Sequence, residues 1–262
     1  MKNKEIWEKR SKLLGDQINS VLFSGMPQVL NEHFHNWQIK IIFSNISVTD
    51  KNLLDLGCGY GRLAVPIIEK FPGLRIKGID ISDNYIRLFK ENTKQDALQY
   101  EIEKYPYEKN YYDCILCSTA LMYVNKQSHS LVLRQLINSL KDNTSKLILI
   151  ENNHSGKSFI NGFGIINLFK KIFKHSKETS GGYIFKKNEI EDLIRLNNAS
   201  IIKEYRISLT TIFIIPIFML SKLLNSFLMN KFLNVILNIE FKISKFKLPT
   251  VHIAYIINKE SN

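Results

Sequence analysis

One stretch organises the sequence: Asn52-Leu53-Leu54-Asp55-Leu56-Gly57-Cys58-Gly59-Tyr60-Gly61-Arg62-Leu63-Ala64. The apolar segment that ends at Asp55 predicts a strand, and the run from Arg62 onward predicts the start of a helix. Three glycines at alternate positions separate the two, and without Cβ atoms they let a ligand come close to the backbone. We therefore expect the loop N–H groups and the helix N-terminus to form a ledge of donors for a small polar ligand.

A second strand is expected at residues 75–80, after a helical segment and the break at Phe71-Pro72-Gly73. It ends in Asp80, which lies 19 positions beyond Gly61. A carboxylate is a pure acceptor with two oxygens, so at the end of the second strand of a βαβ unit it can bind both hydroxyls of a ribose. The two motifs together predict a nucleoside-containing ligand.

The glycine spacing selects among nucleoside-binding families. A nicotinamide-dinucleotide loop would read G-x-G-x-x-G, whereas Arg62 stands here where the third glycine belongs. Residues 54–62 and 78–82 instead resemble the first two motifs of class I S-adenosylmethionine-dependent methyltransferases, and the resemblance is specific over residues 53–151. It implies an α/β, Rossmann-like, seven-stranded, mostly parallel sheet with an antiparallel last strand. It also implies methyl transfer from S-adenosyl-L-methionine, with S-adenosyl-L-homocysteine as the product.

The resemblance also implies which residues bind the cofactor. Glu101 and Ile102 would lie beside the adenine, although the family usually has Asp at the acidic position. Arg10, on an N-terminal helix, would approach the methionine carboxylate, and a solvated surface arginine is the alternative. The complete expected set is Arg10, Asp55, Gly57, Cys58, Gly59, Gly61, Asp80, Ile81, Glu101, Ile102 and Ser118.

The 262 residues are expected to form a single methyltransferase domain. Residues 1–50 would be an N-terminal helical lid, 51–155 the cofactor-binding core, and 156–262 the insertions, a cap and the final strands. Further strands are expected near 97–100, 112–118, 146–151, 200–205 and 251–257. Residues 156–182 would be a helix and loops over the site, the core would resume at 183–185, and Asn188 with Glu191 predicts a capping box at a helix start.

The reaction is expected to be O-methylation of a small molecule. Enzymes that methylate base amines usually carry Asp/Asn-Pro-Pro-aromatic where this chain has Ser-Thr-Ala-Leu at 118–121. Deprotonating a hydroxyl would need a base, which histidine suits. His154 follows the end of the fifth strand, and His33 and His35 on the lid are its competitors. The alternative is catalysis by proximity, with His154 a surface residue.

Charge and cysteine content bear on partners and location. The net charge is +12, of which residues 151–262 contribute +8, which fits an anionic acceptor such as a glycan precursor, or a membrane surface. A proteome generally rich in Lys and Asn is the alternative explanation. Nucleic acid is a poorer fit, because no basic–aromatic alternation is present. Three irregularly spaced cysteines and a polar N-terminal segment without a signal peptide predict a cytoplasmic protein, and no metal is expected.

Residues 209–247 are an unusual insertion before the last strand. Residues 209–220 are almost wholly apolar but too short to span the ~30 Å of a bilayer core. The next run is amphipathic and carries several lysines. A cap over the acceptor pocket is the leading interpretation, and a homodimer surface or an amphipathic element on a membrane, acting on a lipid-like acceptor, are the alternatives. The protein would thus be a monomer or a homodimer.

Overall fold

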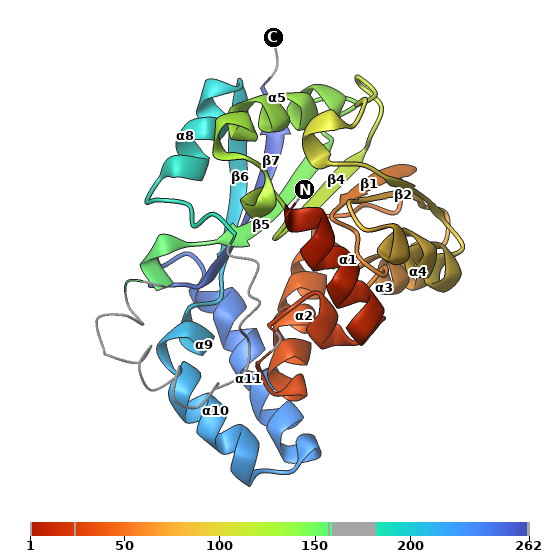
Figure 1. Cartoon of the computed structure of the whole chain (residues 1–262). Coiled ribbons are helices and arrows are strands. Elements are labelled where there is room, and N and C mark those ends of the chain that lie inside the picture. The colour runs from red at the N-terminus through yellow and green to blue at the C-terminus, as the bar shows by residue number, and fades with distance from the viewer. Residues whose placement is uncertain (1, 24, 157, 159–181, 261–262) are drawn as a thin grey trace.

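The structure is a computed structural model that describes residues 2–23, 25–156, 158 and 182–260. Its centre is a seven-stranded sheet of order β3-β2-β1-β4-β5-β7-β6, with helices on both faces (Figure 1). The five strands from β1 to β5 run parallel, and β7 is antiparallel to both of its neighbours, β5 and β6. The expected mostly parallel Rossmann-like sheet with an antiparallel last strand is confirmed.

The strands fall close to their expected positions. Their bounds are β1 (Asn52–Leu56), β2 (Arg75–Asp80), β3 (Asp96–Gln99), β4 (Cys114–Ser118), β5 (Lys146–Asn152), β6 (Ala199–Arg206) and β7 (His252–Lys259). Successive side chains of β1 serve opposite faces of the sheet, Leu53 in one hydrophobic cluster and Leu54 in the other. Both faces are therefore buried, which explains the near-continuous apolar sequences of the central strands.

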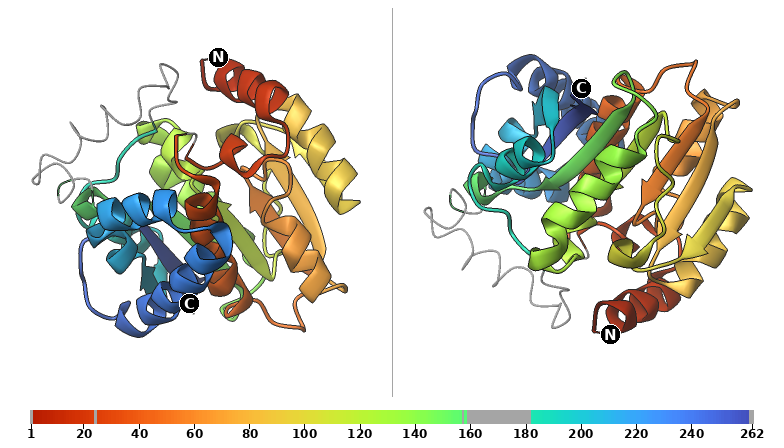
Figure 2. Two further views of the ribbon diagram at one scale, coloured as in Figure 1. Left: turned by 90° about the horizontal axis from the view of Figure 1, so that it is seen from below. Right: turned by 90° about the horizontal axis from the view of Figure 1, so that it is seen from above.

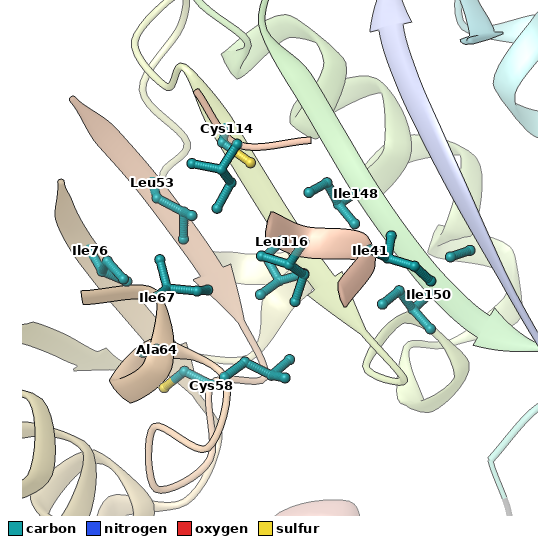
Figure 3. Packing of buried hydrophobic residues seen from close by; sticks show 14 of the residues in the cluster. Ile41, Leu53, Cys58, Ala64, Ile67, Ile76, Cys114, Leu116, Ile148 and Ile150 are labelled. Carbon is teal, nitrogen blue, oxygen red and sulfur yellow. The ribbon is translucent and has the colours of Figure 1, made fainter. Parts of the chain in front are cut away.

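Helices cover both faces of the sheet (Figure 2). Their bounds are α1 (Lys2–Leu14), α2 (Gln28–Phe43), α3 (Ala64–Lys70), α4 (Asp83–Thr93), α5 (His129–Ser139), α8 (Glu189–Leu196), α9 (Ser208–Ile212), α10 (Ile214–Leu223) and α11 (Ser226–Ile243). One face packs against α2, α3 and α4. Figure 3 shows Ile41 of α2 beside Ile148 and Ile150 of β5, and Ile67 of α3 beside Leu53 of β1. The other face packs against α5 and α8.

A side-chain cap forms at the start of α4, whereas the capping box expected at Asn188 and Glu191 does not form. Ser82 caps α4, its Oγ accepting the N–H of Tyr85 at 3.3 Å. Asn188 makes no side-chain cap bond to α8, because its backbone is left-handed with φ 61°. Glu189 instead accepts the backbone N–H of Lys186 at 2.7 Å. Residues 183–185 belong to the hydrophobic core, where Phe185 is buried and Tyr183 packs against the same cluster. The expected helix and loops at 156–182 lie almost wholly outside the described residues.

Residues 207–251 leave and re-enter the sheet at one edge. Arg206, the last residue of β6, pairs with Ile253, and His252, the first residue of β7, pairs with Asn152 at the carboxyl end of β5. The inserted helices α9, α10 and α11 therefore stand at the carboxyl edge of the parallel strands, beside α2 and away from α5 and α8 (Figure 1). No helix in the described part of the chain is long and apolar enough to cross a membrane.

Candidate functional site

The glycine loop after β1 is held by its own backbone bonds. Gly57 and Cys58 donate their N–H groups to the carbonyl of Ile79 at 2.7 and 3.1 Å, and Gly61 donates to Cys58 at 3.1 Å. The N–H of Gly59 donates to Oδ2 of Asp80 at 3.0 Å. These four N–H groups thus have partners inside the protein, which corrects the expectation of a free ledge of donors. The loop shapes the site with its backbone path.

That path requires glycine. Gly57, Gly59 and Gly61 have φ of 69°, 53° and 88°, in the left-handed region that side chains disfavour. A Cβ on Gly57 would lie 2.7 Å from Cβ of Ala120, and one on Gly59 would lie 2.9 Å from Cγ1 of Val21. The loop therefore passes close to two other segments that border the same pocket.

Asp80 joins the ends of β1 and β2. Besides the bond from Gly59, its Oδ1 accepts the N–H of Ser82 at 2.9 Å. The carboxyl is only 8% exposed, and burial raises the pKa of Asp80 to about 6 although its backbone donors oppose this. Each oxygen has a second acceptor site, so the group can still receive two hydroxyls from a ligand.

A pocket with an empty volume of about 890 Å³, part of it open to solvent, lies at this strand edge. Nine of the expected cofactor residues line it: Asp55, Gly57, Cys58, Gly59, Asp80, Ile81, Glu101, Ile102 and Ser118. Tyr123, from the loop after β4, also lines it, as do three residues of the N-terminal segment that the sequence did not single out, Asn3, Trp7 and Val21.

The N-terminal helix covers one side of the pocket. Trp7 meets the ring of Tyr123 edge-on at 5.2 Å, and Asn3 donates to the carbonyl of Tyr123 at 2.9 Å. At the other end of α1, Ser11 hydrogen-bonds Ser82 at 3.1 Å. The helix therefore bridges from the loop after β4 to the start of α4, consistent with a lid.

Arg10 and Gly61 are not among the described residues that line the pocket. The Nη2 of Arg10 donates to the carbonyls of Asn19 and Leu22, both at 2.6 Å, and its guanidinium lies 5.2 Å from the ring centre of Trp7. Arg10 thus holds the turn at residues 19–22, which carries Val21 into the pocket wall. A role in contact with the methionine carboxylate stays a prediction.

None of the three candidate catalytic histidines lines the pocket in the described structure. His154 is exposed and hydrogen-bonds Ser158. His33 is buried against Thr210 of α9, with an Nε2–Oγ1 distance of 2.8 Å, and burial lowers the pKa of His33 to about 4. His35 accepts from Arg62, and burial together with this cation lowers the pKa of His35 to about 3. Their catalytic role stays a prediction.

Arg62 anchors a polar network that the sequence did not reveal. Its Nη1 bonds Nδ1 of His35 at 2.8 Å, and its Nη2 donates to Oε1 of Gln38 at 2.8 Å. Gln38 in turn donates to Oγ of Ser118 at 3.2 Å. The i, i+3 spacing of His35 and Gln38 on α2 was the available signal, since it places both on one helix face. The network connects α2 to the pocket wall.

The pocket wall has more acidic than basic side chains. Four carboxyl groups line the pocket, those of Asp55, Asp80, Glu101 and Glu103, and Arg62 is the one cation among the described lining residues. Burial raises the pKa of Asp55 to about 7, although Arg62 opposes this shift. The Nε of Arg62 is buried and has no hydrogen-bond partner among the described residues. An orphaned donor of this kind indicates room for a ligand or water acceptor.

Part of the sequence matches a known protein family, and the fold is shared with solved structures. Residues 53–143, from β1 to just beyond α5, match the model of a methyltransferase-domain family, and no curated protein sequence matches the chain. An S-adenosylmethionine-dependent methyltransferase from Methanosarcina mazei is a similar solved structure. It is 16% identical with a TM-score of 0.56, and the match covers 85% of this chain and 98% of that one.

Two further solved structures share the fold. Magnesium protoporphyrin IX methyltransferase from Synechocystis, solved with bound SAH, is 16% identical with a TM-score of 0.55, over 78% of this chain and 88% of that one. The 4+2 cyclase SpnF is 14% identical with a TM-score of 0.54, over 86% and 80%. At such identities the likeness to each structure shows the fold alone.

Proposed function

Because the chain carries a class I S-adenosylmethionine-dependent methyltransferase domain, we propose that it methylates an anionic oxygen of a small-molecule acceptor. The observation that carries the choice of an anion is Arg62, the only cation among the described residues of the pocket wall. The partners of its Nη atoms, His35 and Gln38, are uncharged at neutral pH. Asp55, whose pKa is raised by burial to about 7, offsets the charge of Arg62 only in part, so this charge can still attract an anion. The buried Nε of Arg62 offers a further donor.

The described residues fit the cofactor. Asp80 would accept the ribose hydroxyls, and Ile81 and Ile102 would pack against the adenine. Gly57 and Gly59 line the pocket without a Cβ, which suits close approach of a ligand to their backbone. The carboxyl groups of the wall complement a positively charged sulfonium. When bound, S-adenosylmethionine supplies an activated methyl group on a good leaving group.

The other residues expected at the cofactor site would contact the cofactor or support the residues that do. Asp55 and Cys58 would border the cofactor at the end of β1, with Glu101 at the adenine end and Ser118 at the methyl end. Gly61 would act through the loop conformation, and Arg10 through the turn that carries Val21. Each of these roles can be tested by substitution with cofactor affinity as the readout.

An anionic oxygen acceptor also fits the titratable groups of the site. A carboxylate or a similar oxyanion is already deprotonated at neutral pH, so its methylation needs no general base. The protein then has to hold the acceptor oxygen in line with the methyl group and exclude water, and correct positioning alone lowers the barrier substantially. We therefore propose catalysis by proximity, with Arg62 orienting the acceptor.

A lipid-like acceptor is a second candidate. The apolar helices α10 and α11 stand at the same edge of the sheet as the pocket, which would suit an acceptor presented by a membrane. A small soluble oxyanion and the anionic head of a lipid share the chemistry that Arg62 would recognise. Parallel assays with soluble and vesicle-borne carboxylates distinguish them.

Methyl transfer can be tested directly with S-adenosylmethionine labelled in the methyl group. We expect labelled product from an acceptor panel of carboxylates, with the ester identified by mass spectrometry and alkaline release of methanol. R62Q should lower kcat/KM at least tenfold because the oxyanion loses its charged partner. R87Q, on the exposed side of α4, is the matched control.

Two results would contradict the proposal. Label in an amine that resists alkali would place the methyl group on nitrogen. Cofactor binding without transfer to any acceptor or cell-extract component would indicate a non-catalytic S-adenosylmethionine-binding module.

A further inference from the structure

The surface of helices α10 and α11 is unusually apolar. Among the described residues, eighteen large apolar side chains are exposed, and ten of them fall between residues 213 and 248. Leu223 is 79% exposed and Phe227 is 64% exposed, both near the turn that joins the two helices. Single exposed apolar residues are normal on a protein surface, but a cluster on one element indicates an interaction surface.

Helix α11 has two apolar faces. Met229, Leu233 and Leu237 are buried against the rest of the protein. A second stripe, formed by Leu228, Phe232, Val235 and Ile239, follows the i, i+4, i+7, i+11 spacing of one helix face and is exposed to solvent. Helix α11 packs against the rest of the protein through the first face only. The second face is therefore extra to the needs of the fold.

The charge around this stripe has one sign. Residues 207–250 contain five lysines and one acidic residue, Glu240. Glu240 is fully buried and accepts the N–H groups of Leu209 and Thr210 at 3.0 and 2.7 Å, so it contributes no acidic surface. The exposed charge of the insertion is wholly positive.

Three of the lysines lie beside aromatic rings of the insertion. Lys231 is 4.4 Å from the ring centre of Phe227, and Lys222 and Lys245 are 5.4 and 5.3 Å from those of Phe218 and Phe246. The rings of Phe227 and Phe246 are exposed, whereas that of Phe218 is buried. A cation next to an exposed ring is the arrangement of a helix that lies in a membrane interface, with apolar groups toward the acyl chains and lysines at the phosphates.

A lysine-lined hollow adjoins the end of α11. Lys203, Lys245 and Lys247 line it together with Glu204, whose carboxylate pairs with Arg206. Such a hollow offers positive charge where a lipid phosphate would meet the surface.

We infer that the surface formed by α10, α11 and residues 244–248 docks on an anionic phospholipid membrane. Helix α11 has 18 residues and is about 27 Å long, so it can lie in the membrane plane. Because the insertion leaves and re-enters the sheet at the carboxyl edge, docking places the pocket edge near the lipid headgroups. No residue of 207–250 lines the pocket, so the leading interpretation of this segment as a cap gains no support from the pocket wall.

Charge argues against a second copy as the occupant. A two-fold symmetric dimer puts the same patch of both subunits face to face. Five lysines of one subunit would then meet five of the other, without exposed carboxylates between them. An anionic membrane provides the opposite charge and an apolar layer at once. The inference is independent of the acceptor proposed above, because docking needs no turnover.

Sedimentation of the full chain with vesicles tests the inference. We expect binding to an equal mixture of phosphatidylcholine and phosphatidylglycerol, little binding to phosphatidylcholine alone, and loss of binding at high salt, since salt screens exposed charges. The triple variant K222E/K231E/K245E should weaken binding more than tenfold, and so should F232Q/I239Q. The matched controls are K51E/K109E/K187E and L196Q, which alter exposed residues of the same types elsewhere.

Unchanged S-adenosylhomocysteine binding by every variant verifies that the fold and the cofactor site remain intact, independently of methyl transfer. Equal binding of the wild type to both kinds of vesicle, or none to either, would overturn the inference. A wild-type dimer in sedimentation velocity that F232Q/I239Q dissociates would overturn it too and would assign the surface to a second copy.

Discussion

Arg62 and His35 form a hydrogen bond of 2.8 Å between Nη1 and Nδ1. Since a guanidinium can only donate, Nδ1 of His35 must be the acceptor and the imidazole must be neutral. This bond joins the residue after the glycine loop to helix α2, which is otherwise separate from the cofactor motifs in the sequence. The cation at the pocket wall is thus positioned by the N-terminal part of the chain.

This bond predicts a pH dependence of stability. Burial and Arg62 lower the pKa of His35 from 6.5 to about 3. Between these values the unfolded chain binds a proton that the folded protein does not, so the contribution of His35 to folding is lost as the pH falls below 6.5. From pH 7 to pH 5 the loss should be about 2 kcal/mol. Urea unfolding of the wild type and H35Q, whose amide can still accept from Arg62, measures the difference.

H154Q provides the control for this experiment, because His154 is exposed. Its unfolding free energy should follow that of the wild type at every pH. If H35Q and H154Q show the same pH dependence, the pKa of His35 is not lowered in the folded state.

Asp80 predicts a loss of cofactor affinity on a minimal substitution. In D80N the amide has one acceptor oxygen in place of two, and its NH2 would face the N–H of either Gly59 or Ser82. Affinity for S-adenosylhomocysteine should fall by about 1.5–3 kcal/mol, the usual value for hydrogen bonds to a charged group. Calorimetry of D80N measures this loss of affinity, and D83N, a change at the exposed start of α4, is the control. Equal affinity of D80N and wild type would exclude ribose binding by Asp80.

The core of the site was predictable because its determinants are local. The strand from Asn52, the glycine loop and the acid at Asp80 follow one another within 30 residues, and each segment has its own backbone preference. Because the strand, the loop and Asp80 are local features of the sequence, the part of the pocket wall that they form was predictable too. The hydrogen-bond partners of the loop N–H groups were not predictable, because their acceptors on Ile79 and Asp80 depend on the register between β1 and β2.

Long-range packing explains what the sequence left open. The Arg62–His35 pair spans 27 positions and exists only because α2 lies against the sheet. Residues 209–247 were recognisable as apolar and basic, but which side of α11 faces the protein depends on its packing against α2 and α10. Composition showed that this segment has more apolar residues than one face needs, and the structure shows where they lie.

Glu151 predicts a pH dependence of the opposite sign. It is fully buried in β5, its Oε1 accepts the N–H of Leu121 at 2.8 Å, and burial raises the pKa of Glu151 to about 8. The unfolded chain loses this proton near pH 4.5, so stability falls as the pH rises from 4.5 through 8. E151Q, which carries no charge, should be more stable than the wild type by roughly 2–5 kcal/mol at pH 9.

Denaturant unfolding at pH 6 and pH 9 measures this effect. The gap between E151Q and wild type should be wider at the higher pH. E191Q is a matched control, because Glu191 also holds a hydrogen bond, from Tyr255, but is not fully buried. A constant gap across the two pH values would show that Glu151 ionises normally in the folded protein.

The glycine loop predicts a contrast between two glycine-to-alanine changes. Gly57 has φ 69°, and a Cβ there would lie 2.7 Å from Cβ of Ala120, whereas a Cβ on Gly73 would meet no atom within 4 Å. G57A should destabilise the fold by about 1–3 kcal/mol through backbone strain and the clash, and should weaken S-adenosylhomocysteine binding because the loop must shift. G73A should change stability by less than about 1 kcal/mol and leave binding unaltered. Thermal unfolding and calorimetry of both variants test this, and full cofactor affinity in G57A would show that the loop tolerates a side chain at the pocket wall.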